Sequence, residues 1–185
     1  MPMKLVILDR DGVINEDSDN YIRSVDEWIP IPGSIEAIAR LSQAGYTIAV
    51  ATNQSGIGRG YYDLAELDAM HNKMNRLVND NNGLISTIAF CPHTPDDDCD
   101  CRKPQPGLVR QIEANLNTSA EGAWFVGDTG KDIDVARISG CKPVLVKTGK
   151  GNRTLAKASA DDLMGVKIVN SLADFADYLL NGAEA

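Results

Sequence analysis

Short apolar segments alternate with longer segments of helical periodicity along this chain. The apolar segments have strand length, and they lie at residues 4–8, 46–51, 85–90, 123–126 and 143–146. The helical segments lie at residues 34–44, 64–79, 107–115, 132–139 and 171–180. Strands that alternate with helices are typical of βαβ units. The sequence therefore predicts an α/β fold, a Rossmann-like doubly wound parallel sheet with helices on both faces, and a short further strand near residues 166–169.

The size of the chain limits the number of domains. It has 185 residues, of which 43% are hydrophobic. This length suits one domain with a substantial core and is short for two. The sequence contains no internal repeat, low-complexity tract or linker-like segment. We therefore expect a single domain over residues 1–185, and we expect a monomer.

The charge of the chain bears on its partners. The formal net charge is -8, which repels phosphate backbones and anionic lipids over much of the surface. The amino terminus lacks the basic-then-apolar order of a secretory signal, and the longest apolar runs are only as long as strands. We therefore expect a cytoplasmic protein whose partner is a small molecule, and neither a nucleic acid nor a membrane.

Polar segments follow the predicted strands or precede a helix at four places. Ligands of open parallel sheets bind at the carboxyl ends of the strands, so these segments are candidates for a site. They are residues 9–13 (Asp-Arg-Asp-Gly-Val), 52–56 (Thr-Asn-Gln-Ser-Gly), 102–104 (Arg-Lys-Pro) and 127–132 (Gly-Asp-Thr-Gly-Lys-Asp). Each could also be an ordinary turn, a solvated charge or a helix cap, and Asp132 in particular could be an N-cap.

Together these segments resemble the haloacid dehalogenase superfamily, in both order and placement, from about residue 4 to residue 146. The resemblance implies a phosphatase that forms an aspartyl-phosphate. Asp9 would attack phosphorus, and Asp11 would protonate the leaving oxygen and then activate water. We expect a dry neighbourhood around Asp11, because its proton must be shared. Lys103 and Thr52 would stabilise the charge of the transition state, and Lys103 would also keep Asp9 ionised.

The same resemblance implies a catalytic magnesium ion. Asp9 and Asp128, together with the backbone carbonyl of Asp11, offer the all-oxygen ligand set that Mg²⁺ prefers. Such an ion would let an anionic nucleophile approach an anionic phosphate.

A second metal site is predicted in residues 91–101. Three cysteines and a histidine gather there: Cys91, His93, Cys99 and Cys101. In a chain that otherwise looks cytosolic, this grouping favours a metal over disulfides. Three thiolates and one imidazole are the donors of a closed tetrahedral zinc site, so the zinc would be structural. Because Cys101 directly precedes Arg102, the ion would also fix where Arg102 and Lys103 point.

The spacing of the motifs leaves no room for a cap domain. Between Asp11 and Thr52, and between Ser55 and Arg102, we expect only one helix, one strand and loops. The zinc loop joined to residues 102–104 narrows the resemblance to two capless families, the D-glycero-D-manno-heptose-1,7-bisphosphate 7-phosphatases and the histidinol phosphatases. The cysteine spacing is similar to both, whereas residues 52–60 are similar to the heptose family.

The heptose family implies a sugar bisphosphate substrate that loses its 7-phosphate, in the synthesis of ADP- or GDP-heptose precursors such as those of lipopolysaccharide. The candidate substrate contacts are Asp17, Ser18, Asp19, Asn20, Thr52, Asn53, Gln54, Ser55, Arg102, Lys103 and Lys131. The phosphate that stays on the sugar needs cations away from the metal, and Arg59, Arg102 and Lys131 can supply them. In one departure, some relatives carry a basic residue directly after the last metal aspartate, where this chain has Thr129.

Other readings stay open at this point. Histidinol phosphate is the alternative substrate, and the preferred anomer of the heptose is undetermined. A protein that kept the fold and lost the chemistry is disfavoured by the presence of both Asp9 and Asp11. A nucleic-acid 3'-end phosphatase is disfavoured because the chain has no evident basic stripe.

Overall fold

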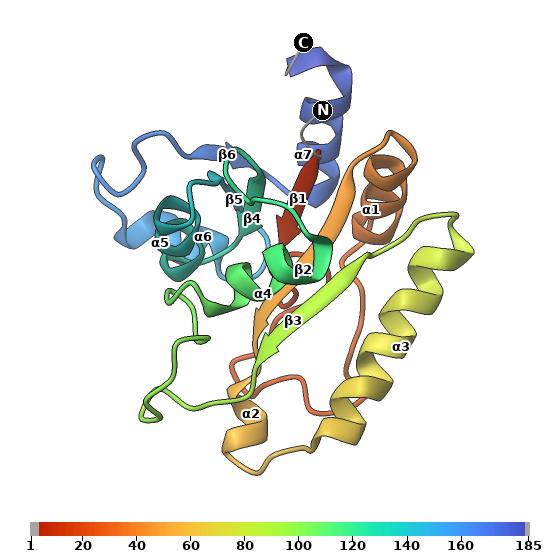
Figure 1. The fold of residues 1–185 in the computed structure, drawn as a ribbon, viewed down its shortest axis with the longest axis vertical. Coiled ribbons are helices and arrows are strands. Elements are labelled where there is room, and N and C mark those ends of the chain that lie inside the picture. Colours follow the sequence, from red (N-terminus) through yellow and green to blue (C-terminus); the bar gives the residue numbers. More distant parts are fainter. Residues whose placement is uncertain (1–3, 184–185) are drawn as a thin grey trace.

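The computed structural model describes residues 4–183, so residues 1–3 and 184–185 of the predicted domain lie outside it. Its centre is a six-stranded parallel sheet with the order β3-β2-β1-β4-β5-β6 (Figure 1). The strands are β1 (Leu5–Leu8), β2 (Thr47–Asn53), β3 (Thr87–Cys91), β4 (Trp124–Gly127), β5 (Lys142–Val146) and β6 (Lys167–Val169). The predicted doubly wound parallel sheet is confirmed.

Helices connect the strands on both faces of this sheet. They are α1 (Ser34–Gln43), α2 (Ser55–Gly58), α3 (Leu64–Asp80), α4 (Gly107–Leu116), α5 (Gly130–Ile138), α6 (Gly151–Lys157) and α7 (Leu172–Tyr178), and a π-helical turn η1 (Leu179–Ala183) follows. The five predicted helices are present, with small differences at their ends. The sequence did not predict α2 and α6 as helices, because both are too short to show a repeating apolar face.

Each face of the sheet has its own apolar core, because successive strand residues point to opposite sides. In β1, Val6 and Leu8 pack into one core, while Leu5 and Ile7 pack into the other. The first core also holds the apolar faces of α1, α3 and α7, and the second holds those of α4 and α5. Figure 1 shows α1 and α3 together on one side of the sheet. Each fully buried Leu or Ile stabilises the fold by about 1.5–3 kcal/mol, so the two cores hold the strand ends in place.

The register of the strands brings the polar segments together. Leu8 is level with Val50 in β2 and with Val126 in β4, so the chain leaves these strands at the same edge. Asp9 and Asp128 follow β1 and β4 there, close to each other. The turn after Asp9 contains Gly12, whose φ is +85° and where a Cβ would lie 2.1 Å from Asp128 Oδ2. A glycine is therefore required at this position, since any side chain would displace Asp128.

The described chain between Asp11 and Arg102 contains α1, β2, α2, α3 and β3 and no further folded unit. In this part of the described chain, the carboxyl edge of the sheet carries loops and the short helix α2. Within residues 4–183, no helix combines the length and the apolar character needed to cross a membrane.

Candidate active site

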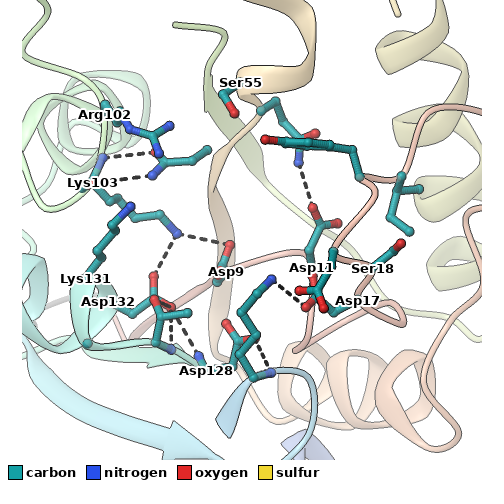
Figure 2. A pocket seen from close by; sticks show the side chains of 18 of the residues that line it. Asp9, Asp11, Asp17, Ser18, Ser55, Arg102, Lys103, Asp128, Lys131 and Asp132 are labelled. Atoms are coloured by element: carbon teal, nitrogen blue, oxygen red, sulfur yellow. Dashed lines mark hydrogen bonds and ion pairs between the residues drawn. The ribbon is translucent and has the colours of Figure 1, made fainter. Parts of the chain in front are cut away.

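A cleft of about 700 Å³ opens at the carboxyl edge of the sheet. Most predicted site residues line it: Asp9, Asp11, Asp17, Ser18, Asp19, Asn53, Gln54, Ser55, Arg102, Lys103, Asp128 and Lys131. Figure 2 shows Arg102 and Lys131 on one side of this cleft and Asp11, Asp17 and Ser18 on the other. The structure thus brings together residues from four separate segments of the sequence.

Two predicted contacts are not among the residues that line the cleft. Thr52 is buried, and its Oγ1 accepts a hydrogen bond of 2.9 Å from Gln54 Nε2. Asn20 is exposed on the loop after β1, where its backbone N–H donates to Ser18 Oγ. In the structure, Thr52 supports Gln54, and Asn20 shapes the loop that carries Ser18.

Lys103 lies at the centre of the carboxylate cluster and is only 3% exposed. Its Nζ is 3.0 Å from Asp9 Oδ1 and 2.8 Å from Asp132 Oδ1, and it also donates to the carbonyl of Ala51. Burial alone would lower the pKa of Lys103, but the charges of Asp132 and Asp9 outweigh this effect and raise it. Lys103 is therefore a permanent cation beside Asp9.

The predicted effect of Lys103 on Asp9 has the expected direction, since the charge of Lys103 lowers the pKa of Asp9. Burial and the negative charge of Asp132 raise the pKa of Asp9 well above its usual value, although Lys103 lowers it in part. Burial and Asp132 likewise raise the pKa of Asp128 to about 7. Crowded, buried carboxylates of this kind ionise readily only when a further positive charge lies among them.

This donor set fits a divalent cation. Carboxylate oxygens of Asp9, Asp128 and Asp132 all lie within 4.8 Å of one another. Asp132, however, already accepts hydrogen bonds at both oxygens, from Lys103 at Oδ1 and from the backbone N–H of Asp128 at Oδ2. Asp9 and Asp128 each keep one carboxylate oxygen without such a contact, so they are the side chains that could hold Mg²⁺.

In α5, Asp132 does not occupy the N-cap position that the sequence suggested for it. Thr129 is the N-cap of this helix, and Asp132 lies three residues further on. Its Oδ2 accepts from the backbone N–H and the hydroxyl of Thr129, which completes a capping box. The reading of Asp132 as an N-cap is thus wrong, since its carboxylate closes the turn from inside the helix.

Hydrogen-bond donors of the protein surround the carboxylate of Asp11. Its Oδ1 accepts from Nε and Nη2 of Arg10, at 2.9 and 2.8 Å, and from Asn15 Nδ2 at 2.9 Å. Its Oδ2 accepts from Gln54 Nε2 at 3.3 Å. Burial would raise the pKa of Asp11, but the charge of Arg10 and these hydrogen bonds outweigh it and lower the pKa. Without ligand, Asp11 is therefore an ionised carboxylate whose orientation is fixed by these hydrogen bonds.

The cysteine segment gathers as the sequence predicts. Donor atoms of Cys91, His93, Cys99 and Cys101 lie within 4.8 Å of one another, and all four cysteines of the chain, including Cys141, are free thiols. Cys91 ends β3, so one donor is fixed to the sheet. Three sulfurs and one imidazole nitrogen are a donor set that fits zinc.

Asn53 connects the end of β2 to the backbone of Lys103. Its Oδ1 accepts from the N–H of Lys103 at 3.0 Å, and its Nδ2 donates to the carbonyl of Lys103 at 3.3 Å. The predicted substrate contact Asn53 therefore also holds the main chain from which the Lys103 side chain projects.

Lys150 is a residue of the cleft that the sequence analysis missed. Its backbone N–H donates to Asp128 Oδ2 at 2.9 Å, and its Nζ is 2.6 Å from Asp17 Oδ2. Thr148 Oγ1 donates to the carbonyl of Gly12, and Thr154 Oγ1 donates to that of Asp128. The signal was available, since polar residues 148–151 (Thr-Gly-Lys-Gly) follow β5 in the same way as the other segments follow their strands.

The chain is similar in sequence to known proteins. A family model described as HAD-hydrolase-like matches residues 100–175. The D-glycero-beta-D-manno-heptose-1,7-bisphosphate 7-phosphatase of Pseudomonas aeruginosa is 59% identical, over 97% of this chain and 99% of its own. The protein of that name from Neisseria meningitidis serogroup A is 51% identical, over 96% of this chain and 95% of its own.

A solved structure extends the similarity to three dimensions. The crystal structure of D,D-heptose 1,7-bisphosphate phosphatase from Bordetella bronchiseptica, complexed with magnesium and phosphate, is 48% identical to this chain. It matches with a TM-score of 0.92, over 99% of this chain and 100% of its own. The chain therefore belongs to the family of heptose 1,7-bisphosphate 7-phosphatases, within the hydrolases of haloacid dehalogenase type.

Proposed function

We propose that this protein hydrolyses the 7-phosphate of D-glycero-β-D-manno-heptose 1,7-bisphosphate. The observation that carries the proposal is the cleft itself, in which Asp9, Asp11 and Lys103 meet beside a group of cations. Relatives that carry the name of this activity, and of the β anomer, are 48–59% identical over nearly the whole chain. The histidinol phosphatases are accordingly the less favoured of the two families.

Asp9 and Asp11 would divide the reaction into two steps. In the first, a carboxylate oxygen of Asp9 bonds to phosphorus while the bond to the leaving oxygen breaks, and Asp11 gives that oxygen a proton. In the second, a water oxygen bonds to phosphorus, Asp11 takes the proton of the water, and Asp9 leaves as a carboxylate. The added negative charge of a bound phosphate would raise the pKa of Asp11, which allows it to carry the first proton.

Lys103 would stabilise the oxygens of the transferring phosphoryl group, and one such donor commonly contributes about 3 kcal/mol. A magnesium ion bound by Asp9 and Asp128 would neutralise charge on the same group. Asp132 would keep Lys103 aimed at it through their 2.8 Å ion pair.

The cations on one wall of the cleft would bind the phosphate that stays on the sugar. Arg102 and Lys131 lie on this wall (Figure 2), and Arg59 and Lys150 also line the cleft. Burial and the charge of Arg102 lower the pKa of Lys131, so the two cations repel each other without an anion between them. A second phosphate would relieve this repulsion, whereas the ammonium group of histidinol phosphate would add to it.

We further propose a structural zinc ion on Cys91, His93, Cys99 and Cys101, in a single-domain, monomeric and cytoplasmic enzyme. The donor set supports the zinc. A role in making the heptose precursors of lipopolysaccharide is consistent with the resemblance to the heptose family.

A substrate screen tests the proposal. We would measure phosphate release from both anomers of the heptose bisphosphate, from histidinol phosphate and from fructose bisphosphate. We expect the β anomer to have by far the highest kcat/KM, and phosphorus NMR to show loss of the 7-phosphate only. A preference for histidinol phosphate would overturn the assignment, and no release from any substrate would indicate a fold that has lost its chemistry.

A further inference from the structure

Arg10 lies between the two catalytic aspartates and is completely buried, with 0% of its surface exposed. A buried guanidinium costs several kcal/mol unless its donors are paired, so its partners show what holds it in place. Two of its nitrogens, Nε and Nη2, donate to the same oxygen, Asp11 Oδ1. Its third nitrogen, Nη1, lies 3.2 Å from Nε2 of His71, a buried residue of α3.

The geometry of these contacts indicates that His71 fixes the orientation of the Arg10 guanidinium. Nε and Nη2 of Arg10 both donate to Asp11 Oδ1, and two bonds to a single atom still allow the plane of the guanidinium to tilt about that atom. The contact between Nη1 and His71 Nε2 supplies a third point, away from Asp11, that fixes the plane. Burial and Arg10 lower the pKa of His71 to about 3, so its ring is neutral and accepts the hydrogen bond from Arg10.

The oxygens of Asp11 are consequently not equivalent. Oδ1 accepts three hydrogen bonds, two from Arg10 and one from Asn15 Nδ2. Oδ2 accepts only the longer contact of 3.3 Å from Gln54 Nε2. Its remaining lone pair is free to carry a proton, which identifies Oδ2 as the atom that exchanges protons with substrate.

We propose that Arg10 and His71 are positioning residues that hold Asp11 with Oδ2 toward the leaving oxygen, a role that rests on the proposed phosphatase function. In the first step, the electron pair of the breaking bond goes to the leaving oxygen, which takes the proton from Oδ2 as Asp9 bonds to phosphorus. In the second, Oδ2 takes a proton from water as the bond between Asp9 and phosphorus breaks. Both transfers need Oδ2 at a fixed place, which His71 secures from the far side of Arg10.

The test compares two substrates that differ in their need for an acid. 4-Nitrophenyl phosphate releases a stable phenolate, whereas the 7-phosphate of the heptose bisphosphate leaves from an alkyl oxygen that must be protonated. Since kcat/KM covers the first chemical step, poor alignment of the acid lowers it for the alkyl substrate far more than for the aryl one. A general loss of structure would lower both alike.

We expect His71→Leu to lower kcat/KM by about tenfold to a hundredfold for the heptose bisphosphate, and by less than about threefold for 4-nitrophenyl phosphate. His71→Gln, which can offer an amide oxygen to Arg10, should recover most of the loss. Met74→Ala is the matched control, because Met74 is a fully buried residue one turn further along α3. It should destabilise the fold without changing the ratio of the two substrates.

Equal losses on both substrates, or no loss on either, would overturn the role of His71. If His71→Leu does not fold, Arg10→Lys provides the same comparison, because lysine keeps the charge but cannot contact Asp11 and His71 in this three-point arrangement. Failure of the wild-type protein to release phosphate from either substrate would overturn the proposed function itself, and is distinct from an unchanged ratio in an active enzyme.

Discussion

Lys103 and Asp132 form a buried ion pair, with 2.8 Å between Nζ and Oδ1 and side chains that are 3% and 2% exposed. The pair connects the loop after the cysteine cluster to the first turn of α5. Together with burial, Asp132 also raises the pKa values of Asp9 and Asp128, so one residue both orients the cation and affects the charge of two neighbouring carboxylates. Its effects can be separated by substitution.

Asp132→Asn should lower the free energy of unfolding by about 1.5–3 kcal/mol, because it removes one of the two carboxylates paired with the buried ammonium of Lys103 and leaves Asp9 as the other. Activity should fall at least about tenfold, because the ion pair with Asp132 no longer holds Lys103 in its orientation. Asp177→Asn is the control, since Asp177 pairs with Arg40 at the same 2.8 Å but on the surface, where such pairs contribute about 0–1 kcal/mol. Urea unfolding of both variants checks the difference, and similar losses would contradict it.

Asp9→Asn should lower kcat by more than about a thousandfold, because the amide keeps the shape of the side chain but cannot form the phosphoryl bond. The fold should be at least as stable, since Asp9 is a crowded carboxylate whose pKa is raised by burial and by Asp132. Phosphate release and the melting temperature measure the two effects. Substantial turnover by the purified variant would rule out the covalent route.

Removal of zinc should loosen residues 91–101 and lower activity about tenfold to a hundredfold, through the displacement of Arg102 and Lys103. Removal of magnesium should stop turnover while the loop stays resistant to proteolysis. Metal analysis should find zinc in the wild type and in Cys141→Ala, whose thiol donates to the carbonyl of Ala120 outside the cluster, but not in Cys99→Ser. Protein purified without chelators and still lacking zinc would disprove the site.

Arg102→Ala should lower kcat/KM for the bisphosphate about tenfold to a hundredfold more than for an aryl phosphate, since a charged hydrogen bond contributes roughly 1.5–3 kcal/mol. Arg110→Ala, an exposed arginine on α4 that does not line the cleft, should change neither value. Equal losses on both substrates would instead place Arg102 at the transferred phosphate or in the support of the loop.

Acid should destabilise the fold in part through His71. Its pKa is about 3 in the folded protein and about 6.5 in the unfolded chain, so only the unfolded chain binds a proton between these values. The contribution of His71 to stability is present above about pH 6.5 and decreases by about 1–2 kcal/mol toward pH 5. Urea unfolding at pH 7 and pH 5 should show a smaller change in His71→Gln than in the wild type, and equal changes would refute this.

The fold and much of the site could be predicted because both rest on local patterns. The apolar runs that become β1 and β4 are each followed by an aspartate, and the parallel sheet brings Asp9 and Asp128 together. What the sequence could not show were pairings between distant segments. The partners of Arg10 and Asp132 are His71, 61 residues away, and Lys103, 29 residues away, and no local pattern relates such positions.

The pKa shifts of the site residues were harder to predict than which residues form the site. Asp9 beside Lys103 suggests an ionised carboxylate, but the balance depends on burial and on the third carboxylate, Asp132. For Asp11, burial alone would raise the pKa, but the donors of Arg10 and Asn15 outweigh it. In both cases the sign of the pKa shift follows from three-dimensional neighbours rather than from residue type.

The contact between the backbone of Lys150 and Asp128 has a consequence for how the protein is made. Asp9, Asp11, Asp128, Asp132 and Lys103 precede β5, so they leave the ribosome before the segment that orients Asp128. A nascent chain that ends at Val146 carries Asp9 and Asp11 but lacks the N–H of Lys150 and the hydroxyls of Thr148 and Thr154. The site therefore gains its last contacts to Gly12 and Asp128 from residues 148–154, which are translated after all its other segments.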